Sequence, residues 1–423
     1  MWNGKFQGVG NGGYQGSISY AAMAAALKRG YAVASTDTGH AGDDPRFAQG
    51  HPERLTDYAW RAIHLTAETG KLIVRNAQGR FAEHSYFVGC SAGGQQAMSE
   101  AQRYPNDYEG IVAGAPANNR IRQTFGFLSA WLATHDSEGK PVLASAKLSL
   151  VTKAVVEACD SLDGLKDGLV DDPRKCHLDP AKLLCAGADG PACLTQPQVE
   201  AVRRMYDGAK SPKTGAAIFS GWPRGSESFG DSPMQGWRAY VLDPAEPMRL
   251  GAFRYFVFHD PNWDFRSIDW DRDLAFAEQQ VPFLAATQRD LGAFKRRGGK
   301  LIAYAGWADP VVPPQDTVAY YEGVTKAMGG APATRDFFRL FMAPGMGHCG
   351  GGPGPSQFDA LTALEQWVEK GTAPEKLVAS HTTAGKVDRT RPLCAYPLVA
   401  RYKGTGSSDE AASFACVADA PKP

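Results

Sequence analysis

The chain has 423 residues, enough to bury one large hydrophobic core and to carry a second, smaller region. Its 45 basic and 45 acidic residues give a formal net charge of zero, so nothing in the charge favours nucleic acid or an anionic membrane as a partner. No run of 18 apolar residues occurs, which excludes a transmembrane helix; the oligomeric state is left open.

The first part of the chain alternates strand and helix patterns. A short apolar run at residues 31–35 predicts a strand, and apolar residues at helical spacing over 57–69 predict a helix that stops at Gly70. A strand, a helix and a second strand are predicted next, at residues 85–88, 94–103 and 111–114. This alternation predicts a mostly parallel sheet that helices cover on both faces.

The character of the chain changes after Pro116. From about residue 118 to residue 281 it is rich in Trp, Pro, Gly and Cys and has no regular period, which favours an inserted lid over more sheet. The earlier pattern then returns, with strands at 300–306 and 338–342 and a helix at 358–369 that Gly371 ends. We therefore predict a core in two parts, residues 1–118 and 286–423, with a lid at 119–285 between them.

The string Gly89-Cys90-Ser91-Ala92-Gly93 follows an apolar strand and opens a helix. This context is typical of the nucleophile elbow of α/β-hydrolases, where a strained, crowded turn needs small neighbours and projects a serine at the carboxyl end of the sheet. The string alone would be a weak signal, but its position between strand and helix makes it a strong one. We predict an α/β-hydrolase core with Ser91 as the nucleophile.

A serine nucleophile needs a histidine as its base, and in α/β-hydrolases that histidine follows the acid in the chain. His348 and His381 are the two of nine histidines that lie beyond the returning strands. His348 stands in a glycine-rich loop after a strand, whereas His381 has no glycine around it and is more typical of a structural residue. We predict that His348 removes the proton of Ser91.

The acid should close a strand between the serine and the histidine. Asp309 meets this condition, because it lies three residues beyond the strand that ends at Gly306. Asp316 and Asp336 fall on helix or loop positions and are weaker candidates. In this interpretation Asp309 stabilises the imidazolium while the serine attacks an ester carbonyl.

The tetrahedral oxyanion needs two backbone donors. One should be the N–H of Ala92, the residue after the nucleophile. The second should come from the glycine-rich turn at residues 10–13, where the absence of side chains lets the backbone approach substrate. Gly12 and Gly13 are both candidates, and the alternative is an ordinary turn with no such role.

The eight cysteines form three pairs that are close in sequence and one distant pair. The close pairs are Cys159 with Cys176, Cys185 with Cys193, and Cys394 with Cys416. The distant pair, Cys90 and Cys349, would join the loops of the nucleophile and its base across about 260 residues. Since eight cysteines allow 105 connectivities, this pairing rests only on proximity in sequence.

Three alternatives remain for the cysteines. All eight could be free thiols in a cytosolic enzyme, Cys90 could be the nucleophile, or Cys90, His348 and Cys349 could bind zinc. A thiolate nucleophile would leave the serine elbow unexplained, and metal ligands are seldom adjacent in sequence. Disulfides favour an oxidising compartment.

An acidic loop lies between Cys159 and Cys176. The carboxylates of Asp160, Asp163 and Asp167 are separated by glycines, and the carbonyls of Leu165 and Leu169 could complete a shell of oxygen ligands. Oxygen donors suit calcium, although the spacing is not that of an EF-hand. We predict a structural calcium ion and no organic cofactor; the alternative is an acidic surface loop.

Cys90-Ser91, Asp309 and His348-Cys349 together resemble the CS-D-HC motif of the tannase and feruloyl esterase family. The resemblance extends over essentially the whole chain, including residues 2–6, 35–40, the acidic loop and the closing helix. It implies an α/β-hydrolase core, a lid inserted after the elbow and calcium bound in that lid. It also implies secreted or periplasmic esterases that act on feruloyl esters, galloyl esters of tannins or mono(2-hydroxyethyl) terephthalate.

Members of this family usually carry an export signal, early strands and often another cysteine pair before the Trp-Asn-Gly segment at which this chain begins. We therefore expect the sequence to be truncated at its N-terminus. A missing early part of the sheet would expose an edge strand and lower stability.

The lid should supply the pocket for the acyl group. Its aromatic rings could stack on a planar acid and its arginines could meet a carboxylate, although packing residues and surface arginines are the plainer interpretation. The predicted contacts are Trp237, Tyr240, Arg249, Phe253 and Arg254. We rank feruloyl esterase first, tannase second and terephthalate monoester hydrolase third. A non-catalytic binding protein would lack part of the triad, and a lipase would need a broad aliphatic groove.

Overall fold

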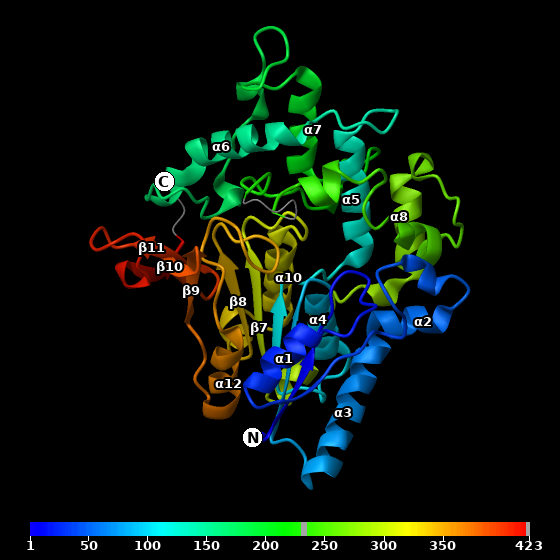
Figure 1. Ribbon diagram of the computed structural model, residues 1–423, viewed down its shortest axis with the longest axis vertical. Coiled ribbons are helices and arrows are strands. Elements are labelled where there is room, and N and C mark those ends of the chain that lie inside the picture. Colours follow the sequence, from blue (N-terminus) through cyan, green and yellow to red (C-terminus); the bar gives the residue numbers. More distant parts are fainter. Residues whose placement is uncertain (230–234, 420–423) are drawn as a thin grey trace.

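The computed structural model of the protein describes residues 1–229 and 235–419. Strands and helices in these residues assemble around one central sheet (Figure 1). In this part of the chain, each helix is too short or too polar to cross a membrane.

Six parallel strands form the central sheet, in the order β2-β1-β3-β4-β7-β8. Their bounds are β1 Lys5–Val9, β2 Ala32–Ala34, β3 His84–Cys90, β4 Gly110–Gly114, β7 Lys300–Gly306 and β8 Phe338–Ala343. The prediction of an α/β fold with a mostly parallel sheet is therefore confirmed.

Side chains that alternate along the strands fill two separate hydrophobic layers. Phe87 and Ile111 pack on one face of the sheet, and their neighbours Tyr86 and Val112 pack on the other. The first face is covered by α3 Ala62–Gln78, α4 Ala92–Arg103, α9 Gly292–Arg296 and α10 Pro314–Ala327. The second is covered by α1 Tyr20–Lys28 and α12 Ala360–Lys370. Both faces are thus removed from water, as a parallel sheet requires.

One helix boundary predicted from the sequence is wrong. The helix expected to stop at Gly70 continues as α3 to Gln78 and ends at Gly79, whose φ of 72° is left-handed. Ahead of α3 lie α2 Pro52–Thr56 and a π turn at Asp57–Arg61. A Cβ at Gly70 would lie 2.7 Å from the ring of Phe6, so this glycine provides room for strand β1 rather than ending the helix.

The segment between β4 and β7 lies above the carboxyl ends of the strands in Figure 1. Apart from α9, which packs on the sheet, its α-helices are α5 Arg120–Thr134, α6 Leu148–Cys159, α7 Gln196–Asp207 and α8 Trp270–Gln280. The strands β5 Ala209–Lys210 and β6 Ala217–Phe219 form a small antiparallel pair. Within the described residues of this segment, none joins the central sheet.

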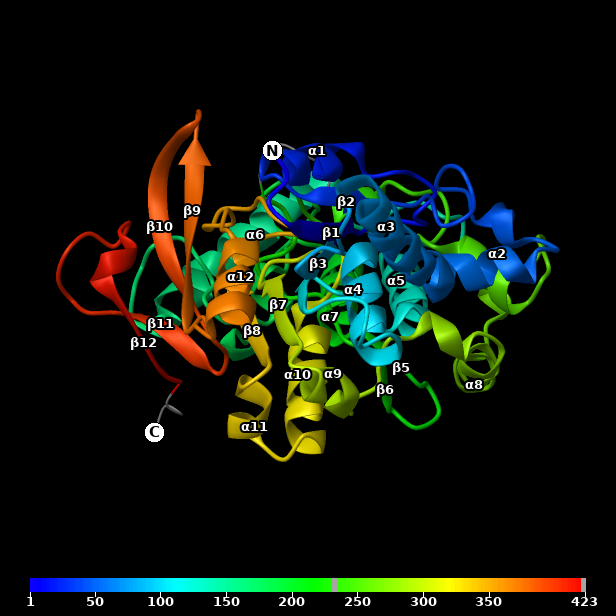
Figure 2. The same cartoon turned by 90° about the horizontal axis from the view of Figure 1, so that it is seen from below.

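The C-terminal part adds strands that lie outside the central sheet (Figure 2). After the short helix α11 Ala331–Arg335 and after α12, two antiparallel pairs follow: β9 Lys376–Thr383 with β10 Lys386–Cys394, and β11 Leu398–Tyr402 with β12 Phe414–Ala418. The predicted second part of the core therefore contains an appended β region. His381 lies in β9, where its Nδ1 is 2.7 Å from a carboxylate oxygen of Asp388.

Candidate active site

Ser91 stands at a sharp turn between β3 and α4. Its φ of 63° and ψ of −119° are a strained backbone conformation for a residue with a side chain. Its N–H donates to the carbonyl of Gly114 at 2.9 Å, which ties the turn to strand β4. A Cβ at Gly89 would lie 2.3 Å from the carbonyl oxygen of Gly93, and a Cβ at Gly93 would lie 2.9 Å from the carbonyl oxygen of Asn11, so neither position has room for a side chain. This is the geometry of a nucleophile elbow.

Asp309 and His348 form a hydrogen-bonded pair. Oδ2 of Asp309 lies 2.8 Å from Nδ1 of His348, and Oδ1 accepts the backbone N–H groups of Val311 and Val312 at 2.8 and 2.9 Å. Asp309 is 0 % exposed, so these hydrogen bonds replace water around its carboxylate. Because Nδ1 is engaged, Nε2 is the ring nitrogen that can exchange a proton with a serine.

The predicted disulfide between Cys90 and Cys349 is confirmed. The Cα atoms of the two cysteines are 6.0 Å apart although 259 residues separate them in sequence. Their neighbours Ser91 and His348 are therefore held on adjoining loops. Cys349 also has a positive φ of 63°, so the bond joins two strained turns.

The other three predicted disulfides are confirmed as well, and they join Cys159 to Cys176, Cys185 to Cys193, and Cys394 to Cys416. All eight cysteines are thereby oxidised. The three alternatives, free thiols, a cysteine nucleophile and a zinc site at Cys90 and Cys349, are wrong because each needs a free sulfur atom.

The glycine-rich turn at residues 10–13 packs directly on the elbow. A Cβ at Gly10 would lie 2.7 Å from the Cα of Gly93. A Cβ at Gly12 would meet nothing within 4 Å, so this glycine borders open space. Ala92 is the first residue of α4, and its N–H has no acceptor inside the helix. The structure thus brings the predicted oxyanion donors and the serine to one end of the sheet.

Arg120 forms hydrogen bonds that hold the glycine-rich turn at residues 10–13 in place. The sequence alone did not reveal this contact. Its guanidinium donates to the carbonyl of Gly13 at 2.7 Å and to the hydroxyl of Tyr58. Across the described chain, no carboxylate forms a salt bridge with it. On the other side of the turn, the amide of Gln96 accepts the N–H of Asn11 at 3.0 Å. No local pattern marks Arg120, because its partner is 107 residues away.

Two of the predicted substrate contacts lie near the site. Arg249 forms a salt bridge with Asp43 at 3.2 Å, and its guanidinium stacks 4.5 Å from the ring centre of Tyr14, which follows the glycine turn. Tyr240 is half-buried against the cluster that contains Val311, next to the acid. Burial raises the pKa of Tyr240, so the phenol stays neutral.

The other three predicted contacts already have partners within the protein. Trp237 is 0 % exposed and its ring N–H donates to the hydroxyl of Ser226 at 2.9 Å. Phe253 is 1 % exposed and packs edge-to-face on Phe125 at 4.9 Å. The guanidinium of Arg254 is engaged by both carboxylate oxygens of Glu246, at 2.8 and 2.9 Å. Phe253 also lines a pocket together with Tyr14 and Arg249, and the role of these three residues as substrate contacts stays a prediction.

The acidic loop offers only oxygen donors, which suit calcium. Asp160 is 4 % exposed and accepts the N–H groups of Asp167 and Gly168, both at 3.0 Å. Gly164 and Gly168 bend the loop with φ of 93° and 83°. The side chains of Asp160, Asp163 and Asp167 are nevertheless not gathered within 4.8 Å of one another, and Asp167 pairs with Arg391. The oxygen donors of this loop are of the type that calcium prefers. The three carboxylates are too far apart, however, to form a complete coordination shell.

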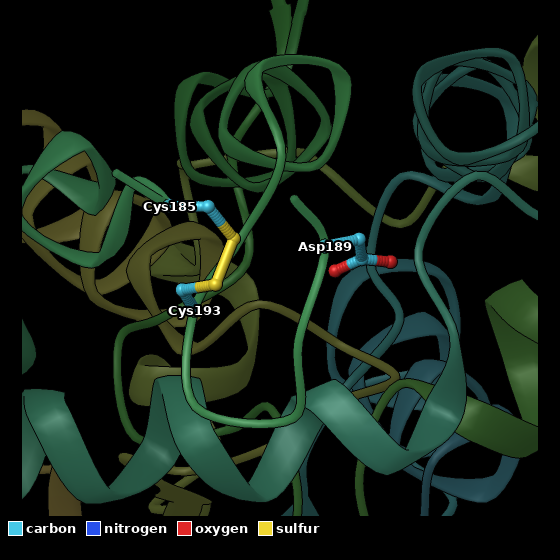
Figure 3. A group of neighbouring side chains, drawn as sticks. All are labelled: Cys185, Asp189 and Cys193. Carbon is cyan, nitrogen blue, oxygen red and sulfur yellow. A yellow bond between two sulfur atoms is a disulfide. The ribbon is translucent and has the colours of Figure 1, made fainter. Parts of the chain in front are cut away.

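One group of three metal-ligating residue types does lie together in the described residues: Cys185, Asp189 and Cys193 (Figure 3). The two sulfur atoms are bonded to each other and cannot act as thiolate ligands. The carboxylate of Asp189 forms a salt bridge with Lys147 at 2.8 Å. This group is therefore a structural disulfide with a neighbouring salt bridge, and not a metal site.

Comparisons with known proteins agree with this geometry. The family model for tannase and feruloyl esterase matches residues 1–417. An uncharacterised esterase of Xanthomonas campestris is 37 % identical over 100 % of this chain and 80 % of its own, and the mono(2-hydroxyethyl) terephthalate hydrolase of Piscinibacter sakaiensis is 36 % identical over 99 % and 80 %. The crystal structure of feruloyl esterase B from Aspergillus oryzae superposes with a TM-score of 0.91 at 31 % identity, covering 98 % of this chain and 85 % of that one.

Proposed function

Because this chain belongs to the tannase and feruloyl esterase family, we propose that it hydrolyses esters of aromatic acids, with feruloyl esters as its preferred substrates. The observation that carries the catalytic assignment is the hydrogen bond between buried Asp309 and half-buried His348, a pair joined through Cys349 to the strained Ser91 elbow. The enzyme is a carboxylic ester hydrolase, and Ser91, His348 and Asp309 are proposed as its triad.

In the proposed reaction, Nε2 of His348 takes the hydroxyl proton of Ser91 as Oγ bonds to the ester carbonyl carbon. The carbonyl oxygen becomes an oxyanion that the N–H of Ala92 and that of Gly12 or Gly13 stabilise. The C–O bond to the alcohol then breaks, and the alcohol leaves with the proton from His348. Water then gives a proton to Nε2 of His348 as its oxygen attacks the acyl carbon. The bond to Oγ of Ser91 breaks, Oγ takes the proton back from His348, and the acid is released.

Feruloyl esters come first because the match to a solved feruloyl esterase B covers nearly the whole chain. Galloyl esters are the second candidate, as the family model covers tannases. Mono(2-hydroxyethyl) terephthalate is the third, and the position of Arg249 beside the glycine turn favours it. A terephthalate carboxylate would have to compete there with Asp43, which already pairs with Arg249 at 3.2 Å.

The test is a comparison of initial rates with methyl ferulate, methyl gallate and mono(2-hydroxyethyl) terephthalate. We expect methyl ferulate to have the highest kcat/KM. Ser91→Ala should lower kcat by about 10⁴-fold or more while the melting temperature stays unchanged. Turnover that survives in a folded Ser91→Ala variant would remove this serine from its role, and a higher kcat/KM for either other ester would overturn the substrate ranking.

We also propose that residues 119–285 act as a lid over the site. A Cβ at Gly347, which precedes His348, would lie 2.5 Å from the side chain of Gln235 and 3.0 Å from that of Phe229. Both residues come from this segment, so it lies directly against the loop of the catalytic base.

The proposal also includes a bound calcium ion and the cellular location of the enzyme. We infer that Asp160, Asp163 and Asp167, with the carbonyls of Leu165 and Leu169, bind one calcium ion after the carboxylates move closer together. The support is a donor set made only of oxygen atoms, three of them carboxylates in a half-buried loop. Four disulfides support a secreted or periplasmic location.

A further inference from the structure

Arg249 and Asp43 form a salt bridge beside the glycine-rich turn. Nη1 of Arg249 lies 3.2 Å from Oδ2 of Asp43, and the guanidinium lies over the ring of Tyr14, 4.5 Å from the ring centre. Arg249 has a left-handed φ of 63°, a conformation that costs free energy in a residue with a side chain. The side chain of Arg249 is 20 % exposed and that of Asp43 is 62 % exposed, so a molecule in solution can reach both.

The pocket beside this pair is lined by aromatic rings and by two guanidinium groups, those of Arg120 and Arg249. Among the described residues of its wall, none is acidic. Arg120 already donates to the carbonyl of Gly13 and to the hydroxyl of Tyr58. Asp43 is not part of the wall, so it neutralises Arg249 from outside the pocket. An unpaired Arg249 would attract a carboxylate on an acyl group, because a guanidinium binds carboxylates through charge-assisted hydrogen bonds.

The other carboxylate oxygen of Asp43 holds the glycine-rich turn. Oδ1 accepts the backbone N–H of Tyr14. The loop that carries Asp43 is fixed against the same turn, since the N–H of Gly42 donates to the carbonyl of Gly16 at 2.7 Å. These two contacts keep the negative charge of Asp43 beside Arg249.

We propose that Asp43 determines the ester specificity of this site, because it neutralises Arg249 and thereby selects against acids that carry a second, ionised carboxylate. A carboxylate brought to Arg249 would also meet the charge of Asp43, and the two negative charges repel each other. A feruloyl group carries a phenol in place of that carboxylate and avoids the repulsion. This role of Asp43 rests on the proposed function, in which the pocket holds the acyl group.

Asp43→Asn separates the two contacts, because its amide oxygen can still accept the N–H of Tyr14 while the negative charge is gone. The ratio of kcat/KM for mono(2-hydroxyethyl) terephthalate to that for methyl ferulate should rise by about fivefold, as expected for the loss of a partly exposed charge. The matched control, Asp44→Asn, removes the neighbouring charge beside Arg46 and should leave the ratio unchanged. In an Arg249→Gln background, Asp43→Asn should no longer raise the ratio.

Binding of terephthalate to the full chain, measured by isothermal titration calorimetry, needs no turnover. Asp43→Asn should lower the Kd for terephthalate by about fivefold. Because Asp43 is exposed, the variant should melt with the native chain. An unchanged ratio in the folded variant, or an equal gain in the Arg249→Gln background, would overturn this role of Asp43. If the native chain hydrolyses neither ester, the proposed function fails instead, and an unchanged Kd for terephthalate would then overturn the role of Asp43 as well.

Discussion

The guanidinium of Arg120 donates to the carbonyl oxygen of Gly13 at 2.7 Å. Through this bond, helix α5 of the lid segment fixes the peptide that follows the proposed oxyanion glycines. The relationship makes Arg120 a positioning residue.

Arg120→Gln should lower kcat by about tenfold and change KM little, because the contact orders a donor that acts in the transition state. Arg120→Lys should restore part of the rate. Steady-state kinetics with methyl ferulate check this. The matched control is Arg122→Gln on the same helix, which breaks the salt bridge to Glu278 and a hydrogen bond of 3.5 Å to the carbonyl of Ile218. An equal loss of kcat in both variants would show a general effect on α5.

Replacing Cys90 and Cys349 by alanine should lower the free energy of unfolding by about 5 kcal/mol, because this bond closes the longest loop in the chain-entropy model. The same model gives about 2–3 kcal/mol for the Cys185–Cys193 bond, whose partners are 8 residues apart. Urea unfolding measures both effects. Only the first replacement should also reduce kcat, since only that bond joins the loops of Ser91 and His348. Unchanged kcat after its loss would mean that packing alone positions the triad.

Removal of calcium should lower the melting temperature by about 2–5 °C and leave the initial rate within about twofold. The reason is that an ion bound only by the folded loop stabilises the fold, while nothing in the geometry connects it to the triad. Calorimetry with and without a chelator measures this. Asp163→Asn should melt at the chelated temperature under both conditions. An identical melting curve for the native chain with and without chelator would remove the ion from the proposal.

Burial raises the pKa of Asp316 to about 6, from an ordinary value of 3.8. The folded state therefore binds this proton more tightly than the unfolded state, and its stabilising contribution is lost as pH rises through about 4 to 6. At about 1.4 kcal/mol per pKa unit, the loss is about 3 kcal/mol. Asp316→Asn should flatten this part of the stability curve, as measured by urea unfolding at several pH values. Asp336→Asn, with a side chain 75 % exposed, should leave the curve unchanged; a flat native curve would contradict the prediction.

The sequence predicted the strands of the core well where the residues of the strand itself form a recognisable pattern. Strands β3, β4, β7 and β8 are apolar runs bounded by glycine or polar turns, and each was expected within a few residues of its position. The error at Gly70 has a different origin, since this glycine serves a contact with Phe6 from a distant strand. A local pattern cannot distinguish a glycine that ends a helix from one that makes room for a neighbour.

The candidate site shows the same division. The predicted elbow, acid and base follow from motifs whose spacing the chemistry restricts, and the disulfides follow from the proximity of the cysteines in sequence. Trp237 and Phe253 are almost fully buried, which the sequence could not show, because the residue type does not distinguish a packing aromatic residue from one that contacts substrate. Arg120 was missed because its role depends on a carbonyl group, which every residue possesses. Such contacts become visible only when the chain is folded.

The backbone contact between Gly10 and Gly93 restricts how this enzyme can evolve. Any side chain at either position would separate the proposed oxyanion turn from the Ser91 elbow, so we expect single substitutions there to give inactive proteins rather than altered ones. New ester preferences must then arise through changes in the segment above the sheet, one mutation at a time, while the chemical machinery stays constant. Selection experiments for other substrates can therefore leave residues 10–13 and 89–94 unchanged and concentrate their diversity in the lid.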